Sequence, residues 1–263
     1  MLYYLMSDRD IEIRWNVSSF RTIIKVVQDK WTDTNLIFDP HFIGFHWYEN
    51  VVAVIIYIYV KDKYEKEPKR LLVACFLFGA VISIFLTTIL YLLFDFILPL
   101  EDKYSVLQQF LRAFFVVALT EEFSKYVIVR YFAQTRKAFN EPFDGIIYAV
   151  MVSMGFAAVE NIFYVIEGGL STAILRAFTA VPAHATFGVL MGYFMGKAKF
   201  SGNRIKDNLL GLSLAILFHG SYDFFLFINF IPGISIGAFV SLIIAIILSR
   251  KAIRMHQEIS YFK

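Results

Sequence analysis

Long apolar stretches recur along this chain, and each of them is long enough to cross a lipid bilayer as a helix. A membrane span satisfies its backbone polar groups internally and needs about 17–25 predominantly apolar residues. Short connections join the stretches, and no convincing internal repeat is present. We therefore expect an all-α fold, a polytopic transmembrane helix bundle of about seven spans, near residues 42–60, 71–94, 107–130, 144–166, 173–196, 208–228 and 232–249.

Composition supports a membrane protein organised as one integral domain. Of the residues, 58% are hydrophobic and 18% are charged, whereas soluble domains average about 45–50% apolar and about 25% charged residues. The formal net charge of +3 gives no indication of a nucleic-acid partner, and the single Cys75 excludes disulfides and cysteine metal clusters within one chain. We expect a polar N-terminal segment (1–41), a membrane domain (42–250) and a short cytoplasmic tail (251–263).

Basic residues gather in every second loop. Lys and Arg crowd residues 61–70, 130–137 and 197–206 and the C-terminal tail, whereas the alternate loops hold almost none. Cytoplasmic loops carry such an excess. The pattern predicts a multi-pass protein of the plasma membrane with a cytoplasmic C-terminus and an N-terminus outside, although the basic residues of the N-terminal segment fit that side poorly.

Two adjacent carboxylates, Glu121 and Glu122, lie inside the predicted span 107–130. A charged group at the centre of a bilayer costs about 2.5–3.5 kcal/mol on insertion scales, so ionisable residues there indicate a functional site. Lys125 shares a helix face with both, at spacings of four and three residues. One Lys neutralises only one carboxylate, which leaves the other free to act as a general base. The alternative is a structural ion pair.

Three further spans carry polar residues, of which His184 and His219 fall at a depth comparable to Glu121 and Glu160 falls deeper from the cytoplasmic side. Glu160 and Asn161 lie in 144–166, His184 lies in 173–196, and His219 lies in 208–228, four residues before Asp223. Carboxylates and imidazoles together are the groups of a water-activating hydrolytic site. The alternatives are a Glu160 at the membrane interface, a His184 hydrogen-bonded between helices, and a self-satisfied His219–Asp223 pair.

His184 also begins a stripe of small residues. Gly188, Gly192 and Gly196 follow it at four-residue spacing, and such a stripe lets two helices approach closely. His184 is therefore expected to point at a neighbouring helix. Pro182 removes a backbone donor beside it and loosens the preceding turn.

These residues in this order resemble the PrsW family of intramembrane proteases, which is related to the CAAX-processing and bacteriocin-processing membrane peptidases. The resemblance covers roughly residues 45–250. Any one of its marks is weak, but several in order, on successive spans, are specific. They are Lys61–Pro68 (KDKYEKEP), Glu121–Lys125 (EExxK), Phe156–Asn161 (FxxxEN), His184, and His219–Asp223 (HGSYD).

The resemblance implies cleavage of single-span, membrane-anchored protein substrates within the lipid bilayer, and in its best-known branch of anti-sigma factors. We expect a catalytic core of four helices, and the resemblance implies Glu121, Glu122 and His184 as its catalytic residues, with His219 and Glu160 close by. Lys125, Asn161 and Asp223 would support them. Zinc or another divalent metal bound by His184, His219 and Glu160 is one expectation, and a metal-free mechanism is another.

Other functions remain open from the sequence. Buried Glu, Asp and His residues also form the proton relays of ion-coupled transporters. A prenyl-protein or bacteriocin-processing peptidase is a second alternative, although the CAAX branch typically has His where this chain has Glu160. A non-catalytic scaffold or immunity-type factor is a third. A site-2-type metalloprotease is not expected, because the chain has no His-Glu-x-x-His motif.

Overall fold

The computed structural model describes residues 49–262, apart from the side chains of 167–171 and 173. The N-terminal segment 1–41 and the start of the predicted span 42–60 therefore lie outside the described residues. Within them, every regular element is helical. The elements are α4 (Glu49–Lys61), α5 (Lys69–Phe78), η1 (Gly79–Ser83), α6 (Ile84–Ile97), α7 (Val106–Leu111), η2 (Arg112–Ala118), α8 (Leu119–Ile128), η3 (Val129–Ala133), α9 (Phe143–Phe178), α10 (Ala180–Phe200), α11 (Arg204–Phe227) and α12 (Ile236–Glu258), the η elements being π-helical turns.

Five described helical segments are long and apolar enough to cross a membrane: Lys69–Ile97, Phe143–Ile166, Ile174–Phe200, Arg204–Phe227 and Ile236–Glu258. The all-helical membrane bundle is thus confirmed, and these five match predicted spans. The count of seven stays a prediction. The predicted span 107–130 is helical throughout, but its five charged residues set it apart from the apolar spans.

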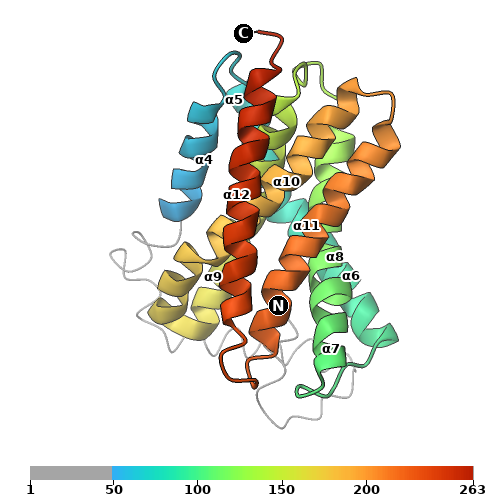
Figure 1. Cartoon of the computed structure of the whole chain (residues 1–263), viewed down its shortest axis with the longest axis vertical. Helices are drawn as coiled ribbons and strands as arrows, with labels where there is room; N and C mark the ends of the chain where they lie inside the picture. Colours follow the sequence, from blue (N-terminus) through green and yellow to red (C-terminus); the bar gives the residue numbers. More distant parts are fainter. Residues whose placement is uncertain (1–48, 263) are drawn as a thin grey trace.

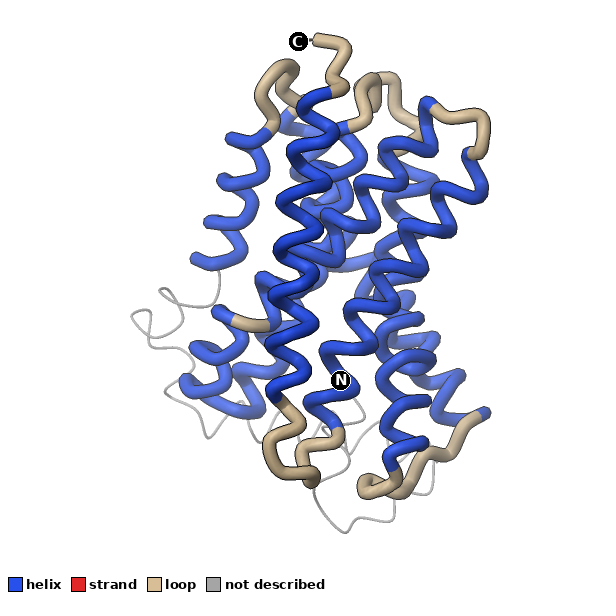
Figure 2. Tube along the Cα trace, in the orientation of Figure 1, coloured by secondary structure: helices blue, strands red, loops and turns tan. Residues whose placement is uncertain are grey.

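The end of α9 departs from the expected loop. A turn was expected at 167–169, yet the backbone stays helical to Phe178 and the helix is broken at Thr179. The chain nevertheless reverses between Glu160 and Arg176. The evidence is that the side chains of these two residues are in contact. A straight helix would separate their Cα atoms by about 24 Å. Figure 2 shows the trace turning back at this end of the bundle.

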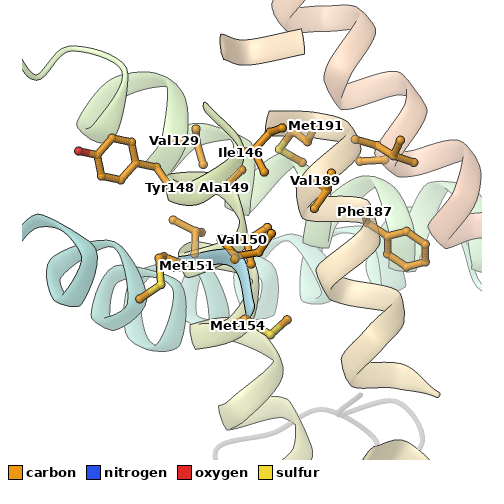
Figure 3. Packing of buried hydrophobic residues seen from close by; sticks show 14 of the residues in the cluster. Val129, Ile146, Tyr148, Ala149, Val150, Met151, Met154, Phe187, Val189 and Met191 are labelled. Carbon is orange, nitrogen blue, oxygen red and sulfur yellow. The ribbon is translucent and has the colours of Figure 1, made fainter. Parts of the chain in front are cut away.

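The core of the bundle is the contact between α9 and α10 (Figure 3). A Cβ on Gly192 would overlap the backbone of Gly145, and one on Gly196 would overlap the carbonyl of Pro142. The predicted glycine stripe therefore does bring two helices into backbone contact. Apolar residues of both helices, including Tyr148 and Phe187, fill the space on either side.

The outer helices present apolar side chains to the surroundings. On α12, Phe239, Ile243 and Ile247 recur every four residues and are 47–61% exposed. Such a stripe is expected on a lipid-facing helix, because hydrocarbon solvates it. The bundle thus presents apolar side chains outward, as a lipid environment requires, around an interior that is mainly apolar but also holds buried polar residues.

The connections divide between the two ends of the bundle as the charge pattern predicted (Figure 1). Loops 62–68, 134–142 and 201–203 lie at the same end as the C-terminus, and loops 98–105 and 228–235 lie at the other. The basic loops therefore share one end. That this end faces the cytoplasm stays a prediction from the positive-inside rule.

Two acidic residues of the loop after α4, Asp62 and Glu67, are buried at that end. Tyr148 of α9 donates a hydrogen bond to Glu67, whose carboxyl also interacts with that of Asp144. Asp62 is 1% exposed, and both of its carboxylate oxygens lack a hydrogen-bond partner among the described residues. Burial raises the pKa of Asp62 from 3.8 to about 6.

We expect Gly192→Val to prevent the close approach of α9 and α10. The added carbons meet backbone atoms, which cannot swing aside as a side chain can. Overpacking costs about 1–3 kcal/mol and more where nothing relaxes. Thermal unfolding and monodispersity in detergent measure the effect. Gly202→Val is the control, because a Cβ at Gly202 meets nothing within 4 Å. Equal stability of the two variants would contradict this account of the packing.

We expect the wild-type protein to lose stability as the pH rises from about 4 to about 6. The folded state holds a proton on Asp62 in this window, whereas the unfolded state releases it near 3.8, so the stability contribution present at low pH disappears as the pH rises. Asp62→Asn, which stays neutral, should flatten this slope and be the more stable protein at pH 7. Glu258→Gln, at an exposed position, is the matched control. An unchanged slope in Asp62→Asn would contradict the assignment.

Candidate active site

Four helices meet around the buried charges of α8. Glu121, Glu122 and Lys125 come from α8, and the other polar residues come from α9, α10 and α11. Every one of Glu121, Glu122, Lys125, Glu160, His184 and His219 is at most 5% exposed. The structure thus brings together the residues that the sequence singled out on four separate spans.

Lys125 occupies the middle of the cluster. Its Nζ atom lies 2.7 Å from Glu122 Oε1, 3.2 Å from His184 Nδ1 and 3.7 Å from Glu121 Oε2. It also lies 4.2 Å from the centre of the Phe156 ring, a favourable cation–π distance. The ammonium group therefore compensates both carboxylates of the pair and connects α8 to α10.

His219 bonds carboxylates on both sides of its ring. Its Nδ1 lies 2.8 Å from Glu122 Oε1, and its Nε2 lies 3.2 Å from Asp223 Oδ2 and 4.0 Å from Glu121 Oε2. Phe187 stacks on the ring at 5.0 Å between centroids. The contact between His219 and Asp223 is the one that their spacing predicts.

The partners of His184 determine its tautomer. Lys125 can only donate a hydrogen bond, so His184 Nδ1 must accept it. The proton of a neutral ring then lies on Nε2, which donates to Glu160 Oε2 at 2.8 Å. The rings of His184 and His219 meet edge to face at 5.3 Å. The two imidazoles are thus held next to each other, each fixed by a carboxylate.

Two residues of the site escaped the sequence analysis. Arg176 donates to Glu160 at 2.7 Å and to Asn161 at 2.8 Å. Tyr91 of α6 donates to Glu121 Oε1 at 2.5 Å. Arg176 lies inside the predicted span 173–196, where a charged residue is itself a sign of a functional site. Tyr91 could have been found from its spacing.

That spacing is a polar stripe along η1 and α6. Ser83, Thr87 and Tyr91 recur every four residues. The hydroxyls of Ser83 and Thr87 lie 2.6 and 2.8 Å from Ser124 Oγ, and Tyr91 reaches Glu121. The span 71–94 therefore contributes a fifth helix to the polar interior, where four were expected in the core.

A cavity of about 500 Å³ opens onto one side of the cluster. Glu121, Glu160, Arg176, His184, His219 and Asp223 border it, whereas Glu122 does not. Glu121 Oε2 and Glu122 Oε2 both lack a hydrogen-bond partner among the described residues, so the cavity lining is what separates the two glutamates. Of the two adjacent carboxylates, Glu121 is therefore the one that can meet a water or a substrate.

The donor set also fits a divalent metal. Ligand atoms of Glu121, His184 and His219 all lie within 4.8 Å of one another. Two imidazoles and a carboxylate suit zinc, and each imidazole is bonded to a further carboxylate, Glu160 or Glu122, as metal-binding histidines usually are. This group differs from the expected ligand set in one residue: it contains Glu121 in place of Glu160, which contacts His184 and Arg176.

The balance of charge points the same way. The cluster holds four carboxylates, of Glu121, Glu122, Glu160 and Asp223, against the two permanent cations Lys125 and Arg176. Buried charge is costly unless it is compensated. Two further positive charges, as protons or as one divalent cation, would make the cluster neutral.

One short motif lies apart from this site. Gly233–Gly237 reads G-x-S-x-G, the pattern of a serine-hydrolase nucleophile elbow. Its Ser235 lies in the turn before α12, follows no strand, and does not border the cavity. The expected nucleophile-elbow context is missing, so the motif carries no serine-hydrolase assignment.

Comparison with known proteins adds a family match over most of the chain. The model of the "PrsW family intramembrane metalloprotease" family matches residues 67–250, a range that contains every residue of the cluster. No solved structure matches.

Curated relatives agree with that match. The chain is 38% identical over 190 residues to "Protease PrsW" of Geobacillus kaustophilus, covering 72% of this chain and 81% of the relative. It is 37% identical over 177 residues to the protein of the same name from Bacillus subtilis, covering 66% and 78%. For that of Clostridioides difficile, the identity is 35% over 187 residues, covering 68% and 77%.

Proposed function

This chain belongs to the PrsW family of intramembrane proteases, and on that premise we propose that the cluster around Glu121 is its active site and hydrolyses peptide bonds of single-span membrane proteins. The observation that carries the proposal is the position of Glu121, which borders a cavity between spans, whereas its neighbour Glu122 does not. Family membership disfavours the transporter, CAAX-type and scaffold alternatives.

Glu121 acts as the general base in this proposal. Tyr91 donates a hydrogen bond to its Oε1, which leaves Oε2 to accept a proton from a water in the cavity. The hydroxide adds to the peptide carbonyl carbon. When the C–N bond breaks, the leaving amine takes a proton from His219, whose ring Glu122 and Asp223 orient. Lys125 keeps Glu122 ionised, so that of the two glutamates only Glu121 gains and loses a proton.

A metal would fit the same residues. Glu121, His184 and His219 would hold it, and a divalent ion there would supply Lewis-acid polarisation and a more acidic water. Glu160 and Glu122 would then orient the two imidazoles from behind. Whether the chain uses such an ion is decided by metal content.

The cavity supports an apolar, membrane-anchored substrate. Besides the polar cluster, its walls are largely aliphatic and aromatic, with Leu98 and Leu100 at the end of the bundle opposite the basic loops. By the positive-inside rule that end is extracytoplasmic. Cleavage near the outer face fits the resemblance to enzymes that cut anti-sigma factors there, and an anti-sigma factor is the substrate we propose to test first.

We expect Glu121→Gln to lower cleavage of a single-span substrate by about 10²–10⁴-fold, the usual contribution of a general base. Wild type and variant are reconstituted in vesicles with a panel of such substrates, and products are identified by mass spectrometry. Glu101→Gln, at an exposed loop position, makes the same chemical change outside the site and should cleave normally. Full cleavage by Glu121→Gln would overturn the proposal.

We expect the purified wild-type protein to carry about one zinc or similar divalent ion per chain, as a site of this donor set would. His184→Ala and His219→Ala should lose it. His256→Asn, a buried histidine away from the site, should retain it. Elemental analysis of folded, monodisperse protein measures the content. Metal-free wild-type protein that cleaves at full rate would show that the metal part is wrong and that Glu121 acts unaided.

A further inference from the structure

We propose that Arg176 is a positioning residue of the protease, which acts through Glu160 to hold His184 in its working tautomer. The inference rests on the proposed function of the Glu121 cluster. It concerns a residue that neither the motif pattern nor the expected catalytic set contains.

Arg176 donates hydrogen bonds to two consecutive side chains of α9, those of Glu160 and Asn161. Its Nη2 donates to Glu160 Oε2 at 2.7 Å and its Nε donates to Asn161 Oδ1 at 2.8 Å. Two bonds from one planar guanidinium fix its orientation, which an ammonium group cannot do. The guanidinium also lies 3.7 Å from the centre of the Tyr164 ring. Tyr164 is four residues after Glu160, on the same helix face. Glu160, Asn161 and Tyr164 of α9 therefore together form the binding site of the Arg176 guanidinium.

A single atom, Glu160 Oε2, connects Arg176 to His184. Glu160 Oε2 accepts from Arg176 at 2.7 Å and from His184 Nε2 at 2.8 Å. A carboxylate held by Arg176 can only accept from the ring, so the ring proton stays on Nε2. His184 Nδ1 then keeps its lone pair toward Lys125 and the catalytic cluster. Arg176, through Glu160, thus supports from the Nε2 side the same tautomer that Lys125 favours from the Nδ1 side.

The charge of Arg176 is needed as well. Glu160 and Glu121 both border the cavity, and without Arg176 the buried Glu160 carboxylate would lose its nearest permanent cation. The negative charge of Glu160 would then have to be compensated by a proton or by Lys125, which already compensates Glu121 and Glu122. Either change would disturb the neighbouring catalytic groups. Arg176 therefore separates the charge balance of Glu160 from that of the α8 pair.

The test compares Arg176→Ala, Arg176→Lys and the exposed control Arg254→Ala in the vesicle assay. We expect Arg176→Ala to lose about 10–100-fold in kcat, as other residues that orient a functional histidine do, with KM nearly unchanged. Arg176→Lys should recover part of the loss. Added methylguanidinium should restore Arg176→Ala alone, because it replaces the missing group.

A double variant separates an indirect role from substrate contact. If Arg176 acts through Glu160, adding Arg176→Ala to Glu160→Gln should cause little further loss. A loss that is the sum of the two single losses, or one expressed in KM, would assign Arg176 to substrate binding and overturn the inference. Wild-type kcat in Arg176→Ala would overturn it too, as would a loss that methylguanidinium does not restore and that follows a lower unfolding temperature.

A readout independent of cleavage completes the test. Nitrogen-15 chemical shifts distinguish the two tautomers, and the signal of His184 is identified by its absence in His184→Gln. We expect a proton on Nε2 in the wild type and a changed pattern in Arg176→Ala. An unchanged pattern refutes the inference whatever the activity. If Glu121→Gln cleaves normally, the proposed function fails. If it is inactive while Arg176→Ala matches wild type in kcat and in shifts, only this inference fails.

Discussion

The buried ammonium of Lys125 is the interaction on which the rest of the structure depends. It lies within 3.7 Å of two carboxylates and an imidazole, at a position with 1% exposure. Two adjacent carboxylates cannot both stay ionised in an apolar interior without such a partner. Because Lys125 bonds Glu122 at close range and Glu121 only loosely, the two glutamates become different groups, one held and one facing the cavity.

The close contact of α9 and α10 makes that arrangement possible. Gly192 against Gly145 removes the side chains that would keep the two backbones apart. His184 can then reach Lys125 on one side and Glu160 on the other. In a bilayer, helices gain little from apolar burial against each other, so small residues and interhelical hydrogen bonds hold the bundle. The same glycines therefore serve the packing and the site.

A continuous chain of polar contacts crosses the interior as a result. It runs from Asp223 through His219 and Glu122 to Lys125, and on through His184 and Glu160 to Arg176. Each imidazole lies between a carboxylate that orients it and the centre of the cluster. The cavity borders both ends of this network, and also Glu121, whereas Glu122 and Lys125 in the middle do not border it. Such shielding of the central charges suits hydrolysis in a membrane, where stray water and free charge are both costly.

By itself, the sequence determined the helical class and which spans carry the polar residues, because apolar length and the cost of buried charge are local properties of a segment. It also predicted the glycine contact and the pairing of His219 with Asp223, since both follow from four-residue spacing. Only the tertiary structure decided that Glu121 rather than Glu122 faces the cavity, that Glu160 supports His184 instead of joining the metal-like group, and that Arg176 and Tyr91 take part. Those choices depend on how helices distant in the chain are rotated and crossed, which no spacing within one helix records.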